Sequence, residues 1–501
     1  MKKLLIVLLL LMRALAVCGQ GINHQWLLGY WNFQDDKGRL LFDSSNYTPL
    51  VEQRKMTFYG TQANISDVNG NLLMASNGIW IANATGDTMM NGGGLNPSPF
   101  TSNWPNGFPL SFGNVILPFP NNTNNFILLH TTLWSTLFPA LSGLYLTSID
   151  MSLDGGFGSV VNKNDTILVD TLSWGIGACR HANGRDWWVV AMRDRQPELF
   201  TFLISSTGID TFFVQPIGFP SNRVGNVSSL VFSTRGDKMM YCLPRDQGSG
   251  GSVANGSVLI FDFNRCTGTI SNMNSIEPSP NSYLWGLAFS ASGNLAYACN
   301  SNFIFQIDMN DFSVDTVAQY DGFISPVGST CCGTTFMNMY LAANGKIYVT
   351  SGSGVQHIHE INYPDSAGIA CDVQQHAIDL GYAQLRSVPN HPNYYLGCDT
   401  TLGCPCLTTN IEEHISHDFR CNVAPNPTNG NFKISYLLPH NQPGKLEVLD
   451  INGRRVYEMN LPHWSTMQEV ILPKSISNGV YNCVITSGGE RGNSKVVVYR
   501  E

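Results

Sequence analysis

The stretch ISDVNGNLLM at residues 65–74 places an apolar run, a polar turn that reaches Gly70, and a second apolar run close together. Glycine adopts positive φ without a steric penalty, so this pattern predicts two antiparallel strands joined by a tight turn. The same pattern returns at Gly184, Gly236, Gly293 and Gly345. Successive glycines are 114, 52, 57 and 52 residues apart, so the long first gap predicts a weaker copy near Asn124-Asn125.

A repeat of about 50 residues with several short strands is typical of a β-propeller, in which each four-stranded blade buries its faces against its neighbours. Six glycine-type turns and a strand expected at residues 392–396 (PNYYL) give seven units across residues 21–407. We therefore predict an all-β fold with a seven-bladed propeller, and six or eight blades are the alternatives. Unrelated hairpins in one large sandwich are the competing interpretation.

Residues 422–501 have their own organisation, which begins with the turn cluster PNPTNGNF at 425–432. Its two prolines and Asn429-Gly430 favour a turn and exclude the start of a helix. Six short β-like runs follow, at 432–436, 445–450, 454–459, 468–472, 479–485 and 495–499. Asn452-Gly453, between the second and third runs, is a strong hairpin signal. This segment is predicted to form a small Ig-like β-sandwich.

Several motifs of this C-terminal segment occur in a fixed order. They are Pro425-Asn426-Pro427 with Gly430, Leu446-x-Val448-x-Asp450-x-x-Gly453-Arg454-x-Val456, Gly479-Val480-Tyr481, and the closing Lys495-Val496-Val497-Val498. Together they resemble the type A C-terminal sorting domain of the Bacteroidetes type IX secretion system, although Ala424 and Glu501 depart from the family pattern. The resemblance implies export to the cell surface or the medium, removal of this domain by a sortase-like cysteine protease, and attachment of the cargo to surface lipopolysaccharide. An Ig-like module without an export role is the alternative.

The ends of the upstream region carry four further stretches. They are Asp67-Val68-Asn69-Gly70-Asn71-Leu72-Leu73, Gly345-Lys346-Ile347-Tyr348-Val349, Ile361-Asn362-x-Pro364 to Gly368-x-x-Cys371, and Pro389-Asn390-x-Pro392-Asn393-Tyr394-x-Leu396-Gly397. These stretches resemble propeller cargo that is often joined to such a sorting domain. The resemblance implies an architecture and a destination but no substrate.

The N-terminus and the segment between the two regions complete the predicted organisation. Residues 1–20 have the pattern of a secretory signal peptide, because Lys2-Lys3 precede an apolar run that is too short to span a bilayer. Lipidation at Cys18 is the less favoured alternative. Residues 408–421 are polar and are predicted to be a linker that a protease can reach. The predicted order is signal peptide 1–20, propeller 21–407, linker 408–421 and sorting domain 422–501.

Charge and cysteine content restrict the partners. The chain has 28 Lys and Arg against 36 Asp and Glu, a net charge of −8. A nucleic-acid partner is not expected, since phosphate binding needs a basic face. The 13 cysteines lie in a chain bound for an oxidising compartment, so we predict disulfides rather than a metal clamp at Cys404-Pro405-Cys406. Cys242 and Cys299 each follow a repeat glycine by six residues, which supports the repeat more than a bond between them.

A few residues are candidates for metal binding. His357 and His359 lie on one face of a predicted strand, and His376 and His391 could complete a set of ligands, although surface histidines are common. Asp67-Val68-Asn69-Gly70-Asn71 has part of the oxygen set of a calcium loop but lacks its downstream Glu, so a hairpin turn is favoured. Ser152-Leu153-Asp154-Gly155-Gly156 is a single degenerate copy of an Asp-box turn. We assign no catalytic residue, no cofactor and no metal.

The sequence contains no G-x-S-x-G, H-E-x-x-H or P-loop motif. Our first hypothesis is therefore an exported binding or interaction module for a glycan or protein ligand. Trp187, Trp188, Tyr283 and Trp285 could stack on such a ligand, although blade core is the better interpretation for most of them. The alternatives are an extracellular hydrolase or lyase acting on a polysaccharide or protein, and a structural component of the envelope. A plugged channel favours the binder, whereas converging carboxylates favour the enzyme.

Overall fold

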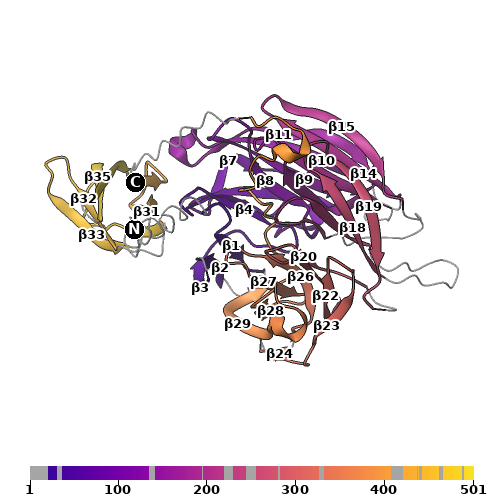
Figure 1. Cartoon of the computed structure of the whole chain (residues 1–501). Helices are drawn as coiled ribbons and strands as arrows, with labels where there is room; N and C mark the ends of the chain where they lie inside the picture. Colours follow the sequence, from indigo (N-terminus) through magenta and orange to yellow (C-terminus); the bar gives the residue numbers. More distant parts are fainter. Residues whose placement is uncertain are drawn as a thin grey trace, which may run out of the picture.

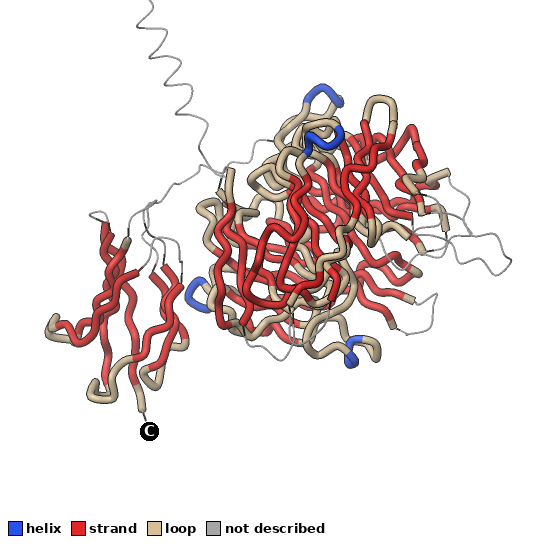
Figure 2. The backbone as a smooth tube through the Cα atoms, turned by 90° about the horizontal axis from the view of Figure 1, so that it is seen from below, coloured by secondary structure: helices blue, strands red, loops and turns tan. Residues whose placement is uncertain are grey.

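A computed structural model of the chain consists almost entirely of β-strands (Figures 1 and 2). The structure describes residues 21–30, 36–43, 45–134, 141–194, 196–218, 229–243, 256–279, 283–326, 332–407, 421–436, 438, 443–461, 467–487 and 490–500. Within these ranges the helices are short 3-10 turns, η1 (Thr101–Asn103), η2 (Asp154–Gly156), η3 (Gly368–Cys371) and η4 (Thr400–Leu402). None of the described helices is long and apolar enough to cross a membrane.

Six groups of four antiparallel strands follow one another along the chain. The first two groups are β4 (Ala63–Ser66), β5 (Leu72–Ser76), β6 (Trp80–Asn83), β7 (Thr88–Gly93) and β8 (Asn114–Pro118), β9 (Asn125–Leu133), β10 (Ser142–Asp150), β11 (Ser159–Asp170). The next two are β12 (Leu172–Arg180), β13 (Trp187–Arg193), β14 (Glu198–Ser205), β15 (Gly208–Pro216) and β16 (Leu230–Phe232), β17 (Lys238–Leu243), β18 (Ser257–Asn264), β19 (Thr269–Ile276). The last two are β20 (Leu287–Phe289), β21 (Leu295–Cys299), β22 (Phe303–Asp308), β23 (Val314–Gln319) and β26 (Phe336–Leu341), β27 (Ile347–Ser351), β28 (Val355–Ile361), β29 (Val373–Gln384). A short pair, β24 (Ile324–Ser325) and β25 (Cys332–Gly333), lies between them.

The first strand of each group faces the middle of a ring. Strands β4, β8, β12, β16, β20 and β26 are neighbours in that order. Strands inside a group are apolar on both faces, as in WWVVAM of β13, whereas outer strands such as β15 and β19 are largely exposed. The all-β propeller prediction is therefore confirmed. The count of seven blades stays a prediction, because a pairing of Met90 with Ser159 joins the first two groups into one eight-stranded sheet.

The repeat glycines lie in the turn between the first and second strands of their groups. The φ angles of Gly70, Gly184, Gly236, Gly293 and Gly345 are 86°, 79°, 71°, 73° and 80°. In the remaining group the β8–β9 turn lies where the weaker copy is expected, and Asn121 supplies the positive φ of 65°. Asn is the non-glycine residue that tolerates this conformation best, so the repeat keeps its turn without its glycine.

Three N-terminal strands close the ring. They are β1 (Gln25–Leu28), β2 (Asp36–Phe42) and β3 (Tyr47–Gln53), and they lie between β4 and the β26–β29 group (Figure 1). The Trp26 ring meets Tyr348 edge-on, with centroids 5.6 Å apart. Buried Arg54 donates a hydrogen bond of 2.6 Å to the Leu28 carbonyl oxygen and forms an ion pair with Glu52. The aromatic contact therefore joins the first and last parts of the propeller, and the Arg54 contacts hold the N-terminal strands together.

Residues 385–407, which we call the channel segment, contain no strand, so the strand predicted at 392–396 is wrong. The segment instead passes through the middle of the ring. The Asn390 side-chain amide donates to the carbonyl oxygens of Asn114 in β8 at 3.1 Å and Ile176 in β12 at 2.8 Å. Pro389 and Pro392 have no N–H to give to a β-ladder, which explains why the segment does not pair as a strand. The sequence analysis counted residues 392–396 as the seventh propeller unit. In the structure, strands β1–β3 form that unit instead.

Two disulfides fasten the channel segment. Cys266, in the turn after β18, is bonded to Cys404, and Cys398 is bonded to Cys406. The prediction of disulfides is confirmed, and the sulfur atoms of Cys404 and Cys406 belong to these bonds rather than to a metal clamp. The free cysteines among the described residues are all buried: Cys179, Cys242, Cys299, Cys371, Cys421 and Cys483.

The C-terminal strands form two sheets, β30-β31-β34 and β33-β32-β35-β36. Their bounds are β30 (Cys421–Ala424), β31 (Asn431–Tyr436), β32 (Gly444–Leu449), β33 (Arg455–Leu461), β34 (Met467–Ile471), β35 (Gly479–Ser487) and β36 (Glu490–Val498). Apolar side chains of both sheets, including Phe432, Val448 and Val496, share one core. The predicted sandwich is confirmed, with β30 as a strand that the sequence analysis did not predict. At the predicted hairpin, the Asp450 carboxylate accepts the backbone N–H of Asn452 at 3.0 Å.

Two predicted segments cannot be compared with these elements. The signal peptide at 1–20 lies outside the described residues, and so does the linker at 408–421 except for Cys421, which begins β30.

Replacing Cys266 and Cys404 with serine is expected to lower the free energy of unfolding by about 2–5 kcal/mol, because this disulfide closes a long loop. The bonded residues are 138 positions apart in the chain. Thermal unfolding with and without reductant measures the effect. Replacing Cys398 and Cys406 is the control and should cost less, because those residues are only 8 positions apart. A wild-type melting temperature that does not respond to reductant would contradict the expectation.

Candidate functional site

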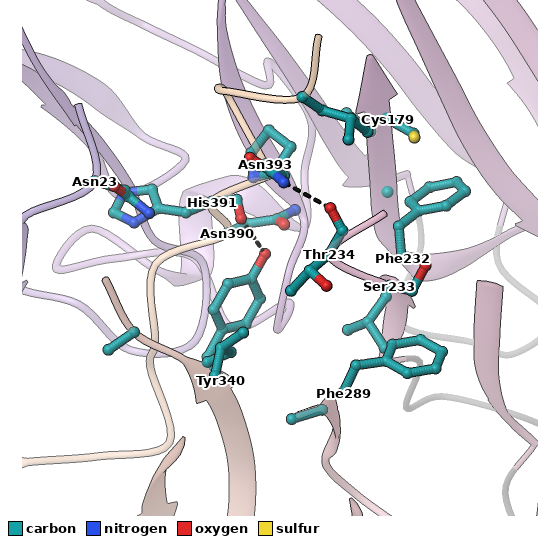
Figure 3. Close-up of a pocket in the computed structure, with 18 of the residues that line it drawn as sticks. Asn23, Cys179, Phe232, Ser233, Thr234, Phe289, Tyr340, Asn390, His391 and Asn393 are labelled. Carbon is teal, nitrogen blue, oxygen red and sulfur yellow. Dashed lines mark hydrogen bonds between the residues drawn. The ribbon is translucent and has the colours of Figure 1, made fainter. Parts of the chain in front are cut away.

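A cavity of about 300 Å³ lies at the end of the ring that carries the turns between first and second strands (Figure 3). One wall comes from the inner strands β12, β16, β20 and β26 and the turns that follow them. The channel segment, with Asn390 to Asn393, forms the other wall. The cavity is therefore the part of the channel that the channel segment leaves open.

The inner-strand wall is apolar, with polar groups at the turns. Figure 3 shows Phe232 and Phe289, at the ends of β16 and β20, on the same side of the cavity as Thr234. The Thr234 hydroxyl donates to the Ala291 carbonyl oxygen at 2.8 Å, so adjacent turns are tied together. Burial raises the pKa of the Cys179 thiol to about 12, so this cysteine is a poor nucleophile at neutral pH. This wall provides aromatic surface rather than reactive groups.

Hydrogen bonds fix the wall formed by the channel segment. The Tyr340 hydroxyl donates to the His391 carbonyl oxygen at 2.6 Å, and Asn393 donates to the Thr234 carbonyl oxygen at 2.7 Å (Figure 3). His391 Nε2 lies 2.6 Å from the Asn64 carbonyl oxygen and must carry the proton, so Nδ1 is the unprotonated nitrogen. Nδ1 itself is buried and has no hydrogen-bond partner. These hydrogen bonds tie the wall to β26, to β4 and to the turn after β16.

The cavity lining carries one charged side chain and no acidic one among the described residues. Burial lowers the pKa of Arg180 to about 10, so this lining residue stays protonated at pH 7. Burial lowers the pKa of His391 to about 4 and also lowers the pKa of His24, so both imidazoles are neutral at pH 7. The Arg180 guanidinium lies 3.9 Å from the centre of the Trp187 ring and donates to the Tyr394 carbonyl oxygen. A site with aromatic and hydrogen-bonding walls, and with no described acidic group or imidazole that titrates near pH 7, suits the binding of a polar ligand better than proton transfer.

Of the four histidines considered as metal ligands, the structure brings His357, His359 and His376 close together and leaves His391 apart. His357 and His359 lie in β28 and His376 in β29, but His391 lies in the channel segment. His359 Nδ1 accepts the backbone N–H of His376 at 2.9 Å, and His376 Nε2 lies 3.0 Å from Asp321. Within the described ranges, no group of three His, Cys, Asp or Glu residues is arranged to hold a metal ion. The four-histidine site is therefore not formed.

The two other candidate motifs belong to local turns. The Asp67 carboxylate accepts the backbone N–H groups of Asn69 and Asn71, each at 2.9 Å, and so completes the β4–β5 turn. This is the hairpin that was favoured over a calcium loop. The Asp-box-like stretch 152–156 lies in the connection between β10 and β11 and contains η2. Both motifs therefore lie in turns that connect neighbouring strands.

The candidate aromatic residues divide into two pairs. Trp187 and Trp188 have exposed fractions of 0% and 3%, which confirms that they are blade core. Tyr283 and Trp285 are half-buried in the connection before β20, and their rings stack with centroids 6.0 Å apart. Only the second pair is accessible to a ligand.

The sequence analysis missed the residues that build the cavity. Phe232, Phe289 and Tyr340 are apolar or aromatic residues at strand ends, and no local pattern distinguishes them from core. The stretch Asn390-His391-Pro392-Asn393 did carry a signal, because a polar run with proline cannot pair as a strand and yet connects apolar neighbours.

Comparisons with known proteins identify the C-terminal part. Residues 422–499 match the family model described as the secretion system C-terminal sorting domain. The chain carries a type IX secretion sorting domain. This domain marks the protein as a secreted cargo and indicates export through the type IX secretion system to the cell surface or the extracellular space. The match leaves the propeller of this cargo outside the family model.

Comparisons of the whole type IX cargo are less specific. No curated protein matches it. A functionally unknown protein from Desulfotomaculum acetoxidans has 11% identity and a TM-score of 0.37, with 73% of this chain and 99% of that one covered. The GH74 enzyme of Niastella koreensis has 14% identity and a TM-score of 0.37, with 97% of this chain and 74% of that one covered. At these TM-scores neither likeness supports an inference about activity.

The stability of the cargo is expected to fall below neutral pH because of His391. Burial holds its pKa at about 4, below the value of 6.5 for an unburied histidine. The unfolded chain therefore binds the proton first, so the stabilisation is complete above pH 6.5 and is lost as the pH falls toward 4. The loss is up to about 3 kcal/mol. Denaturant unfolding between pH 7.5 and pH 4 measures it, and His391→Asn, which keeps a donor for Asn64, should show a smaller change over the same range.

Removal of residues 422–501 is expected to leave the propeller in the periplasm, because the truncated chain lacks its export signal. Cell fractionation and protease treatment of intact cells measure the location. In the reciprocal experiment, residues 408–501 are joined to a periplasmic reporter, which should then reach the cell surface. Normal surface display of the truncated cargo would contradict the assignment.

Proposed function

We propose that the exported propeller is a binding or interaction module, and that its ligand enters the cavity beside the channel segment. The observation that carries this proposal is the channel segment itself, because it is tied to the surrounding strands by hydrogen bonds, fills one side of the channel and leaves a cavity on the other. Side chains that already make hydrogen bonds lose little entropy when a ligand enters, which favours binding.

The aromatic and hydrogen-bonding groups of the cavity support a polar ligand that also has an apolar face. Phe232, Phe289 and Tyr340 offer ring surface to the apolar face of a ligand. Asn23 and the partly exposed Asn393 and Thr234 offer polar groups at the opening. A sugar unit of a neutral glycan has both an apolar face and hydroxyl groups, so a glycan fits this combination, and a polar loop of a protein is the second possibility.

The alternative function is an extracellular hydrolase or lyase. Glycoside hydrolysis needs two carboxyl groups that flank the bond to be broken. The absence of Asp and Glu from the lining of this cavity argues against that chemistry at this position. We therefore favour binding over catalysis for the cavity.

The complete pathway that we propose follows the predicted organisation. The signal peptide at 1–20 leads the chain to the periplasm, and residues 422–501 engage the type IX machinery. A sortase-like protease then cuts within the linker at 408–421 and attaches the propeller at 21–407 to surface lipopolysaccharide. The sorting-domain match supports the role of the machinery, and the later steps rest on the resemblance.

A glycan array and a panel of surface proteins, probed with the full secreted chain, test the proposal. We expect saturable binding to at least one neutral glycan or protein. Ala291 lies exposed at the cavity opening, so Ala291→Trp should block the cavity and abolish that binding. Ile369→Trp is the matched control, because Ile369 is 87% exposed and does not line the cavity.

Two results would contradict the proposal. One is ligand binding that Ala291→Trp leaves unchanged. The other is cleavage of a bound glycan or protein with release of product, which would favour the hydrolase or lyase.

A further inference from the structure

A second cluster of aromatic and charged residues lies where the channel segment enters the ring, at the end opposite the cavity. Tyr30 follows β1, Tyr59 precedes β4, Trp104 lies in the connection before β8, and Arg386 follows β29. The rings of Tyr30 and Tyr59 are 5.5 Å apart, and those of Tyr59 and Trp104 are 4.8 Å apart. We call these four residues the Arg386 cluster.

The backbone of Arg386 is fixed by the propeller. Its carbonyl oxygen accepts hydrogen bonds from Asn338 Nδ2 at 2.7 Å and from Thr350 Oγ1 at 3.1 Å. Its guanidinium carbon lies 5.4 Å from the centre of the Tyr59 ring, in a cation–π arrangement. The charge is therefore presented at the channel entrance without any movement of the strands.

Arg386 has no acidic partner among the described residues. Its Nε is buried and has no hydrogen-bond partner. Burial lowers the pKa of Arg386, and the groups that oppose this shift are Tyr59, through its charge and a side-chain hydrogen bond, and Tyr30, rather than any Asp or Glu. A buried or half-buried charge without a counter-ion costs free energy, so natural proteins rarely keep one without a use. An anion bound from solution would supply the missing charge.

The other members of the Arg386 cluster indicate which chemical group accompanies the negative charge of that anion. Tyr30, Tyr59 and Trp104 are all half-buried, so part of each ring faces solvent. Aromatic rings pack against the C–H face of a sugar, while phenol and indole groups can donate to its oxygen atoms. A simple inorganic anion would use the arginine and leave this ring surface without a partner.

We propose that the Arg386 cluster binds a carboxylated sugar, a uronate, with the carboxylate at Arg386 and the sugar ring against the aromatic side chains. The planar guanidinium matches a carboxylate through two parallel hydrogen bonds. A neutral sugar would leave the charge of Arg386 uncompensated. This site is separate from the cavity at the other end of the ring, so it stands whether or not the cavity binds a glycan.

Titration of the full secreted chain with sodium D-galacturonate and sodium D-glucuronate tests the proposal, with D-galactose and D-glucose as neutral counterparts. At least one uronate should bind saturably, and at least about tenfold more tightly than its neutral counterpart. Its affinity should fall as salt is raised. Arg386→Gln should raise the Kd for the uronate at least about tenfold. Arg235→Gln is the control and should change nothing, because Arg235 lies at an exposed turn of the cavity end.

Further variants keep the test decisive if Arg386→Gln does not fold, which thermal unfolding would reveal. Arg386→Lys keeps the charge but loses the two-pronged geometry, and Tyr30→Ala removes ring surface, so each should weaken uronate binding. The proposal is overturned if no uronate binds saturably to the wild-type chain, or if folded Arg386 and Tyr30 variants bind it unchanged. Acetate that binds as tightly as the uronate would overturn the assignment to a sugar.

Discussion

The side-chain amide of Asn390 donates to carbonyl oxygens of two neighbouring inner strands, and this pair of hydrogen bonds holds the middle of the propeller together. Inner strands of a ring have backbone groups that face the axis, where burial makes an unpaired carbonyl costly. The channel segment satisfies two of these groups from within. The rest of the ring can then close around it, because the segment replaces water that would otherwise fill the channel.

The same segment determines the chemistry at both ends of the ring. At its start, Arg386 is held by Asn338 and Thr350 and meets the aromatic residues around the entrance. Farther along, His391 and Asn393 form a wall of the cavity. One end combines Arg386 with a cluster of aromatic rings, and the other is a cavity with apolar and hydrogen-bonding walls, so a single extended stretch of chain helps to form two different surfaces.

Local patterns in the sequence revealed the parts of the fold that depend on local chemistry. The turn glycines need positive φ whatever surrounds them, so Gly70 and its later copies indicated the repeat. In the same way, the hairpin at Asp450 indicated the strands of the sorting domain. The cavity and the Arg386 cluster have no such signature. Their residues meet across groups of strands, as when Tyr340 reaches His391, and only the closed ring brings them together.

The order of contacts along the chain also has a consequence for the timing of export. The ring needs Trp26 beside Tyr348 and Asn390 beside Asn114, so it cannot be completed before nearly all of the cargo is available to fold. Pairings so distant in sequence are slow to form. The sorting domain follows the last of these residues, so it is synthesised only after every part of the ring. The order of the chain therefore delays export until the whole ring sequence is present.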